Sequence, residues 1–150
     1  VSVSFLIICA TIYTRMLAMS GMPQFLVESM THAGLGATAF LMLYVLIVIA
    51  LGMVVDSSSI LLIVLPLMLP LAEQFGMNLI WFGVVTVVAV EIGLLTPPFG
   101  LSVYVIKSTL QDQSVSLGDI FRGTAPFTLM MLAVLLLLIF FPSISLVLLK

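Results

Sequence analysis

Charged residues are scarce in this sequence. Asp, Glu, Lys and Arg make up 7% of its 150 residues, whereas 63% are hydrophobic. Because about a quarter of the residues in soluble domains are charged, this composition excludes a soluble domain and predicts an integral membrane protein. The formal net charge of −2 is small, so it indicates neither a nucleic-acid footprint nor a polybasic lipid-binding surface.

Cysteine and histidine are also nearly absent, since Cys9 and His32 are each the single residue of their type. One cysteine excludes an internal disulfide, and its place in an apolar run favours a small buried hydrophobe. His32 has no second histidine, cysteine or carboxylate at ligand spacing, so we interpret it as an interfacial loop residue rather than a metal ligand. The sequence lacks an initiator methionine and a basic stretch before its first apolar run, and we expect a fragment of a longer chain.

What the sequence has instead is apolar runs of helical length. They predict an all-α membrane protein, a broken-helix bundle that forms one membrane domain over residues 1–150. The expected outer elements are an apolar helix over 1–18, a short amphipathic surface helix over 23–30, a second surface helix capped by Ser116 within the polar segment 111–123, and a last transmembrane helix over 126–149.

Residues expected at the membrane surface give little information on orientation. Trp81 follows a polar loop, where an aromatic belt would anchor the next helix. Arg15 and Lys150 are expected on one side of the membrane, and Lys107 and Arg122 on the other. The positive-inside count is therefore tied, and the orientation stays open.

Two apolar runs, 37–51 and 60–71, are each too short for a full crossing, which needs about 20 residues. A glycine, an aspartate and three serines lie between them. The pattern predicts a re-entrant hairpin over 37–72 whose tip lies near the middle of the membrane. Pro66 and Pro70 are one turn apart in the second arm and predict that it bends or ends there.

The proline pair Pro97-Pro98 interrupts the next apolar run. Proline has no N–H, so the carbonyls of Gly93 and Leu94 lose their helical partners. An unpaired carbonyl in hydrocarbon costs several kcal/mol, so such a break persists only against other protein or around a cavity. The sequence therefore predicts a discontinuous helix over 80–107, with a candidate binding site at its break, residues 96–100.

Oxygen-rich segments at the hairpin tip and the break are typical of a cation site. The candidate residues are Gly52, Asp56, Ser57 and Ser58 at the tip and Gly93, Thr96, Pro97 and Gly100 at the break. One carboxylate among mostly neutral donors favours a monovalent ion such as Na+ over Ca²⁺. We expect the Na+ ligands at Gly52, Ser57, Gly93 and Thr96, and no other cofactor.

The two carboxylates of this region each have two interpretations. Asp56 is ionisable inside a membrane segment, which marks a functional site, but it can equally cap the second hairpin arm, and both roles can coexist. Glu91 either faces the cavity as a coupling residue or pairs with a partner outside this chain.

Four stretches of this sequence resemble the large membrane subunit, the DctM-type permease, of tripartite ATP-independent periplasmic (TRAP) transporters. They are Gly52 to Ser57 (GMVVDS), Pro66 to Pro70 (PLMLP), Phe82 to Val84 (FGV) and Glu91 to Leu101 (EIGLLTPPFGL). Their order and spacing also match. The resemblance covers nearly the whole chain and implies the C-terminal part of that subunit.

The resemblance implies an ion-transporter-superfamily fold in which this chain supplies half of an inverted repeat. Residues 52–59 and 96–100 would together form one Na+ site. The implied function is Na+-coupled uptake of small organic anions, such as C4-dicarboxylates or sugar acids, by an elevator mechanism. The implied partners are a small four-helix membrane subunit and a periplasmic substrate-binding protein, and the implied location is the bacterial or archaeal cytoplasmic (inner) membrane, which the chain crosses several times.

Three other functions compete with this interpretation. One is a related ion-coupled anion transporter that needs no binding protein, and another is a membrane assembly subunit that transports nothing. The third is an intramembrane hydrolase that uses Asp56 with Glu91. Acid catalysis by such a pair requires two converging carboxylates, and no activating motif accompanies either residue, so we do not expect an enzyme.

Overall fold

The computed structural model describes residues 2–32, 34, 36–110 and 115–147, and every regular element within them is a helix. The predicted all-α class is therefore confirmed. Expectations for Val1, residues 111–114 and residues 148–150 lie outside the described residues. In chain order the helices are α1 (Ser2–Met19), α2 (Met22–His32), α3 (Ala37–Gly52), α4 (Ser57–Ser59), the π-helical turn η1 (Ile60–Val64), α5 (Leu65–Gln74), α6 (Leu79–Leu95), α7 (Leu101–Thr109), α8 (Leu117–Phe140) and α9 (Ser143–Leu146).

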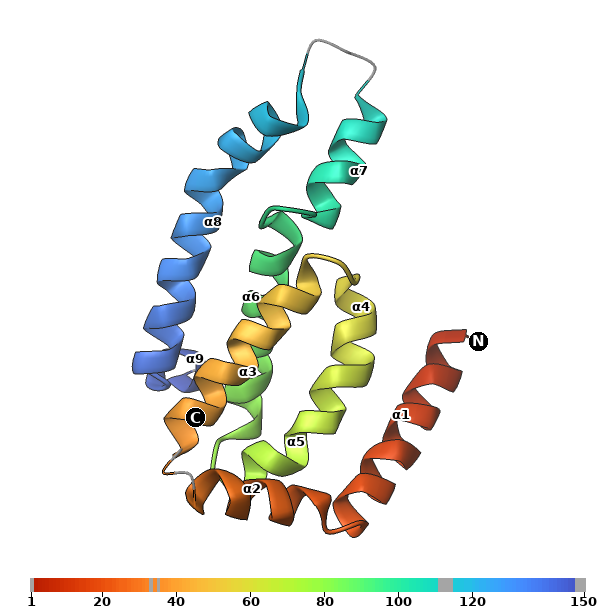
Figure 1. Ribbon diagram of the computed structural model, residues 1–150, viewed down its shortest axis with the longest axis vertical. Helices are drawn as coiled ribbons and strands as arrows, with labels where there is room; N and C mark the ends of the chain where they lie inside the picture. Colours follow the sequence, from red (N-terminus) through yellow and green to blue (C-terminus); the bar gives the residue numbers. More distant parts are fainter. Residues whose placement is uncertain (1, 33, 35, 111–114, 148–150) are drawn as a thin grey trace.

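The helices form an elongated bundle (Figure 1). α2 lies across its lower end, and α3 rises from there to a turn about halfway up the bundle. The continuous stretch α4–η1–α5 returns to the lower end, so the two arms make a helical hairpin that does not reach the upper end. α6 rises in the same direction as α3, and after a break the chain continues upward as α7 before α8 descends along the bundle.

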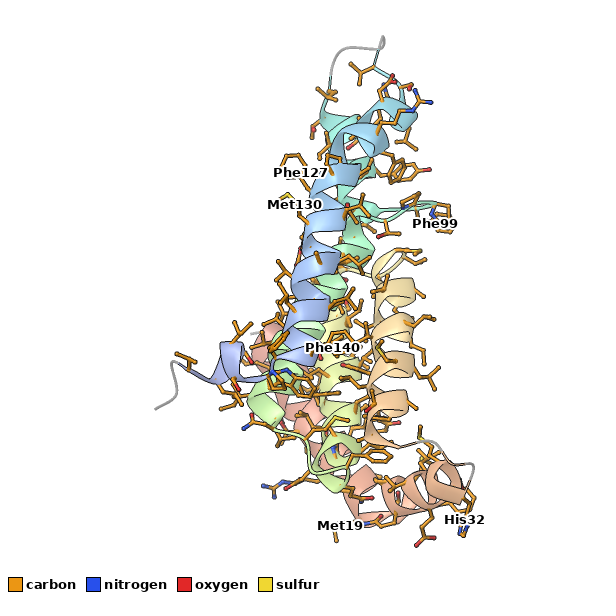
Figure 2. The ribbon with its side chains drawn as sticks, turned by 90° about the vertical axis from the view of Figure 1, so that its left-hand side faces the viewer. Met19, His32, Phe99, Phe127, Met130 and Phe140 are labelled. Atoms are coloured by element: carbon orange, nitrogen blue, oxygen red, sulfur yellow. The ribbon has the colours of Figure 1, made fainter. Side chains whose placement is uncertain are left out.

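Two stretches of the described chain are long and apolar enough to cross a membrane, judged by length and composition. They are Ser57–Gln74 and Leu117–Phe140. Many large apolar side chains on the outside are exposed, and Figure 2 shows Phe127, Met130 and Phe140 along α8. Such a surface would be unfavourable in water but suits lipid or neighbouring membrane helices.

The second hairpin arm accommodates its prolines instead of ending at them. The π-helical turn η1, in which the backbone bond runs to a carbonyl five residues back, ends at Val64, two residues before Pro66. Proline lacks an N–H and its ring crowds the carbonyl four residues back, so the wider turn relieves the crowding. The arm therefore continues from Ser57 to Gln74 as one helical stretch.

Helix α8 begins earlier and ends earlier than the range 126–149 expected from the sequence. Its start is set by a capping box, in which the N–H of Asp119 donates to the Ser116 hydroxyl (3.2 Å) and the N–H of Ser116 donates to the Asp119 carboxylate (3.0 Å). The helix then passes through Pro126. The expected surface helix and the membrane helix are thus one element, because the cap stabilises its first turn and one proline removes only a single backbone bond.

The core lies mainly between α3 and α6, with α5 and α8 against them. Four aromatic rings fill its lower part: Tyr44 stacks on Phe82 with 4.6 Å between ring centroids, and Phe40 stacks on Phe75 at 5.0 Å. Aromatic side chains bury about 150–250 Å² each, so these four rings contribute a large share of the apolar area that stabilises the core.

Trp81 is an internal residue rather than the interfacial anchor expected from the sequence. Its side chain is 8% exposed, and its indole Nε1–H donates to the carbonyl of Leu138 at 2.7 Å. That carbonyl would normally accept from the N–H four residues later, but this position is Pro142, which has none. The indole therefore completes the C-terminal end of α8 and attaches it to α6.

One residue of α1 is less buried than the sequence suggested. Cys9, which was expected to be a buried hydrophobe, is exposed. α1 packs against α2, η1 and α5, so its remaining face has no neighbour within the described chain. His32 is the last residue of α2, is exposed and lies at the lower end of the molecule (Figure 2).

Replacing Trp81 with Phe tests the attachment of α8. Phe keeps the aromatic packing but leaves the Leu138 carbonyl without a donor, so the free energy of unfolding should fall by about 1–3 kcal/mol. Thermal unfolding of the detergent-purified protein measures this effect. Phe127→Leu, on the exposed face of the same helix, is the control and should leave the midpoint unchanged; equal midpoints for both variants would contradict the assignment.

Candidate functional site

Gly52 and Gly93 bring α3 and α6 into direct backbone contact. A Cβ atom built on Gly52 would lie 2.9 Å from the Val90 carbonyl oxygen and 3.0 Å from the Gly93 Cα. A Cβ on Gly93 would lie 2.5 Å from the Ile49 carbonyl oxygen and 2.8 Å from the Gly52 Cα. No larger side chain fits at either position unless the helices separate. The structure thus brings together two of the candidate residues, Gly52 from the hairpin tip and Gly93 from the helix that precedes the break.

The hairpin turn directly follows this contact. After Gly52 the N–H groups of Val54 and Val55 both donate to the Leu51 carbonyl, at 3.0 and 2.8 Å. Asp56 then has extended backbone and caps the second arm: its carboxylate accepts from the N–H of Ser59 at 2.9 Å and from the Ser59 hydroxyl at 2.6 Å. The capping interpretation of Asp56 is therefore correct, and the side chain is also exposed.

The break between α6 and α7 begins at Thr96, whose backbone is extended. Its N–H donates to the Gly93 carbonyl at 3.0 Å, and its hydroxyl donates to the Ile92 carbonyl at 2.6 Å. Thr96 thus supplies one of the bonds that the prolines cannot make. No backbone N–H of the described chain donates to the carbonyls of Leu94 or Leu95.

Gly100 starts the second half of the broken helix. Its φ of +50° is in the left-handed region, which glycine adopts without strain. A Cβ there would also lie 2.8 Å from the ring of Phe121, on α8. α7 therefore begins where the backbone is left-handed and passes closely beneath an aromatic ring, and both conditions favour glycine.

A cavity of about 360 Å³ lies between the hairpin tip and the segment where the break ends and α7 begins. Met53 and Val54 line it from the tip, and Phe99, Leu101 and Tyr104 line it from the break and α7. Phe99 is 56% exposed and projects away from the helices (Figure 2).

The predicted residues do not all lie in one place. Ser58 lines a different cavity of about 380 Å³, between α1 and the second hairpin arm, together with Cys9 and Tyr13. The Glu91 side chain is exposed and forms no hydrogen bond or ion pair with another described residue, whereas both Asp56 carboxylate oxygens accept from Ser59.

Sequence reasoning missed two residues of this region. Ser59, rather than Ser57 or Ser58, holds the Asp56 carboxylate, and the three-residue spacing from the capping residue to the donor could have indicated it. Phe121 covers Gly100 from a helix that follows in the chain, and no local pattern marks that contact.

Comparisons with known proteins agree on one family. Residues 1–144 match the family model of the tripartite ATP-independent periplasmic transporter, DctM component. Among curated relatives, the C4-dicarboxylate TRAP transporter large permease protein DctM is 34% identical in Rhodobacter capsulatus, over 96% of this chain and 32% of the relative. The protein of the same name in Vibrio cholerae is 33% identical, over 94% of this chain and 30% of the relative.

A relative with a different named substrate is also similar. The sialic acid TRAP transporter large permease protein SiaM of Vibrio cholerae is 29% identical over 97% of this chain and 34% of its own length. The chain thus spans about a third of the length of the curated relatives it matches.

An alanine at Gly93 tests the helix contact. Its Cβ would meet backbone atoms that cannot rotate away, so the free energy of unfolding should fall by about 1–3 kcal/mol or more. Thermal unfolding in detergent is the measurement. Gly83→Ala is a matched control in the same helix, because a Cβ there meets nothing within 4 Å, and it should be neutral or slightly stabilising. Equal destabilisation by both alanines would show that the two helices do not touch at Gly93.

Proposed function

Because this chain belongs to the DctM component of the tripartite ATP-independent periplasmic transporters, a permease family rather than an enzyme class, we propose that it forms the Na+-binding half of a permease that takes up small organic anions. One observation carries this proposal. The Gly52–Gly93 contact holds the C-terminal ends of α3 and α6 together, close to the points where the backbone leaves helical geometry.

The converging helix ends favour a cation. α3 ends at Gly52 and α6 ends at Leu95, and the C-terminal carbonyls of a helix carry partial negative charge. Several of these carbonyls receive no backbone N–H within the described chain. Two such ends held in contact repel each other unless a cation or donor lies between them, so an ion that bridges them stabilises the arrangement.

The proposed Na+ ligands retain free acceptor positions. A carbonyl oxygen has two lone pairs, and the Gly93 oxygen uses one for the Thr96 N–H. The Thr96 hydroxyl donates its proton to the Ile92 carbonyl, so its own oxygen remains available as an acceptor. With the Gly52 carbonyl and the hydroxyl of Ser57 at the start of the second arm, they form a set of neutral oxygens that suits a monovalent cation. Pro97 and Gly100 shape the backbone of the break.

Asp56 supplies negative charge in addition to its cap. Each of its oxygens accepts one bond from Ser59, and a carboxylate has further lone pairs free. We assign it an electrostatic contribution to the cation site. Glu91 lies outside this set, and its exposed side chain is placed for pairing with a segment beyond this chain or for coupling.

Ion binding would couple to transport through the hairpin. A bridging Na+ binds tightly only when tip and break are in contact, so it favours that conformation by its differential affinity. In a membrane the hairpin α3–α5 would be re-entrant. The chain would have the ion-transporter-superfamily arrangement and supply half of an inverted repeat. Transport would proceed by an elevator mechanism. The protein would lie in the inner membrane as a multi-pass subunit.

The family supports the proposed partners and substrate class. Relatives carry the names of C4-dicarboxylate and sialic acid transporters, so the proposed substrate is a small organic acid of this kind. The proposed partners are a small four-helix membrane subunit and a periplasmic substrate-binding protein. Because this chain spans about a third of its relatives, transport would require the rest of the permease.

Uptake into proteoliposomes tests the function. The full-length permease with its small subunit is given an inward Na+ gradient or an equal K+ gradient, with and without the binding protein. We expect uptake only with both Na+ and the binding protein. Uptake with Na+ alone would instead indicate a transporter that needs no binding protein, and uptake independent of Na+ would exclude the cation site.

Two substitutions separate the charge of Asp56 from its cap. Asn caps helices about as well as Asp, so Asp56→Asn should leave thermal stability unchanged but raise the half-saturating Na+ concentration about threefold to tenfold through the lost charge. Asp56→Ala should in addition lower stability by about 1 kcal/mol.

Asp119→Asn is the matched control, because Asp119 is also a capping carboxylate but belongs to the start of α8. It should leave the Na+ dependence of uptake unchanged. An unaltered Na+ dependence in Asp56→Asn would limit Asp56 to its capping role.

A further inference from the structure

We propose that the buried hydroxyl pair Tyr44–Thr86 sets the register of α3 on α6 and thereby tunes the affinity of the Na+ site at their upper ends. The inference rests on the proposed function. Tyr44 and Thr86 are positioning residues: neither belongs to the ligand set, and they act on it through the two helices that carry it.

The two side chains form a directional link inside the core. Tyr44 is 3% exposed and Thr86 is fully buried. The Thr86 hydroxyl donates to the Phe82 carbonyl at 2.8 Å, so its only proton is used. The contact of 3.0 Å between the two hydroxyl oxygens therefore has the Tyr44 phenol as donor and Thr86 as acceptor.

This hydrogen bond and the glycine contact lie at two points along the same helix pair. α3 and α6 rise in the same direction (Figure 1). Tyr44 precedes Gly52 by eight residues and Thr86 precedes Gly93 by seven, which is about 12 Å and about 10.5 Å along the respective helices. Two contacts so separated fix both the sliding and the rotation of one helix against the other.

The hydroxyl pair contributes a directional interaction, which the surrounding apolar contacts lack. The rest of the α3–α6 interface is hydrophobic, and hydrophobic attraction is non-directional, so it tolerates small shifts of one helix along the other. A hydrogen bond weakens steeply with distance and angle, and a buried hydroxyl that loses its partner finds no water to replace it. The pair therefore favours one register over its neighbours.

Register matters because the proposed ligands come from both helices. The Gly52 carbonyl is on α3, and the Gly93 carbonyl and Thr96 hydroxyl are at the end of α6. A shift of α3 along α6 changes the distances between these oxygens, so it weakens cation binding even when the protein remains folded.

Tyr44→Phe removes the link with little other change. The ring keeps its stacking on Phe82 (4.6 Å between centroids), and Thr86 keeps its bond to the Phe82 carbonyl, so no polar group is left without a partner. In the double variant Tyr44→Phe/Thr86→Val both partners become apolar with nearly the same shape, which is commonly close to neutral for stability. Thr86→Ser retains the hydroxyl.

The first measurement is the Na+ dependence of uptake by the full permease complex in proteoliposomes, together with the thermal unfolding midpoint of each variant. We expect Tyr44→Phe and the double variant to raise the half-saturating Na+ concentration about threefold to tenfold with maximal uptake retained. Thr86→Ser, which retains the hydroxyl, should keep the original value. Tyr13→Phe, at an exposed tyrosine on α1, is the control and should match the unaltered protein.

A second measurement follows the register without relying on Na+. In a Cys9→Ser background, V54C and Y104C place thiols on two sides of the cavity between the hairpin tip and α7. A short thiol-specific cross-linker should join them readily, and more slowly once Tyr44→Phe is added.

The outcomes distinguish this inference from the function on which it rests. Unchanged half-saturating Na+ and unchanged cross-linking in Tyr44→Phe overturn it, and so does a lower unfolding midpoint without either change, since that describes a purely structural residue. If uptake by the unaltered complex does not depend on Na+, the proposed function fails. In that case slower cross-linking in Tyr44→Phe still supports the register role, and unchanged cross-linking overturns the register role.

Discussion

The backbone contact between Gly52 and Gly93 is the constraint on which this arrangement depends. Helix axes usually stand about 8–10 Å apart because side chains separate them, whereas here the backbones meet directly. Gly52 ends α3, and Gly93 lies in the last turn of α6. The closest point of the crossing is therefore also the place where two sets of helix carbonyls converge. A protein that only needed a tight crossing could place it at the middle of both helices, where every carbonyl is already bonded.

Polar side chains inside the bundle serve to connect particular helices. The Trp81 indole attaches α6 to the end of α8, and the Tyr44 phenol attaches α3 to α6 through Thr86. Each of these bonds joins residues far apart in the sequence, and each acceptor group is buried away from water. In a chain that is 63% hydrophobic, burial alone has little power to choose one packing among several. Such bonds therefore contribute specificity more than total stability.

The sequence was informative where backbone chemistry decides the outcome. Missing N–H groups at Pro97-Pro98 predicted the break, and the serines after Asp56 predicted a cap, because both effects act within a few residues. The burial of the Trp81 side chain was not predicted. Its partner, the Leu138 carbonyl, is 57 residues away in the chain, and only the fold shows that Pro142 leaves it without a helical donor. The contact of Gly52 with Gly93 could not be predicted for the same reason. The sequence shows each glycine, but their contact depends on how α3 and α6 cross.

Prolines deprive helix carbonyls of donors at several points of this chain, and the responses differ. Before Pro66 the backbone widens into a π-helical turn. Before Pro142 the freed carbonyl accepts the Trp81 indole. Before Pro97-Pro98, Thr96 supplies its N–H and hydroxyl to Gly93 and Ile92, yet the next two carbonyls receive no backbone donor within the described residues. The open carbonyls at this break, held against a second helix end, are the physical basis of the proposed cation site.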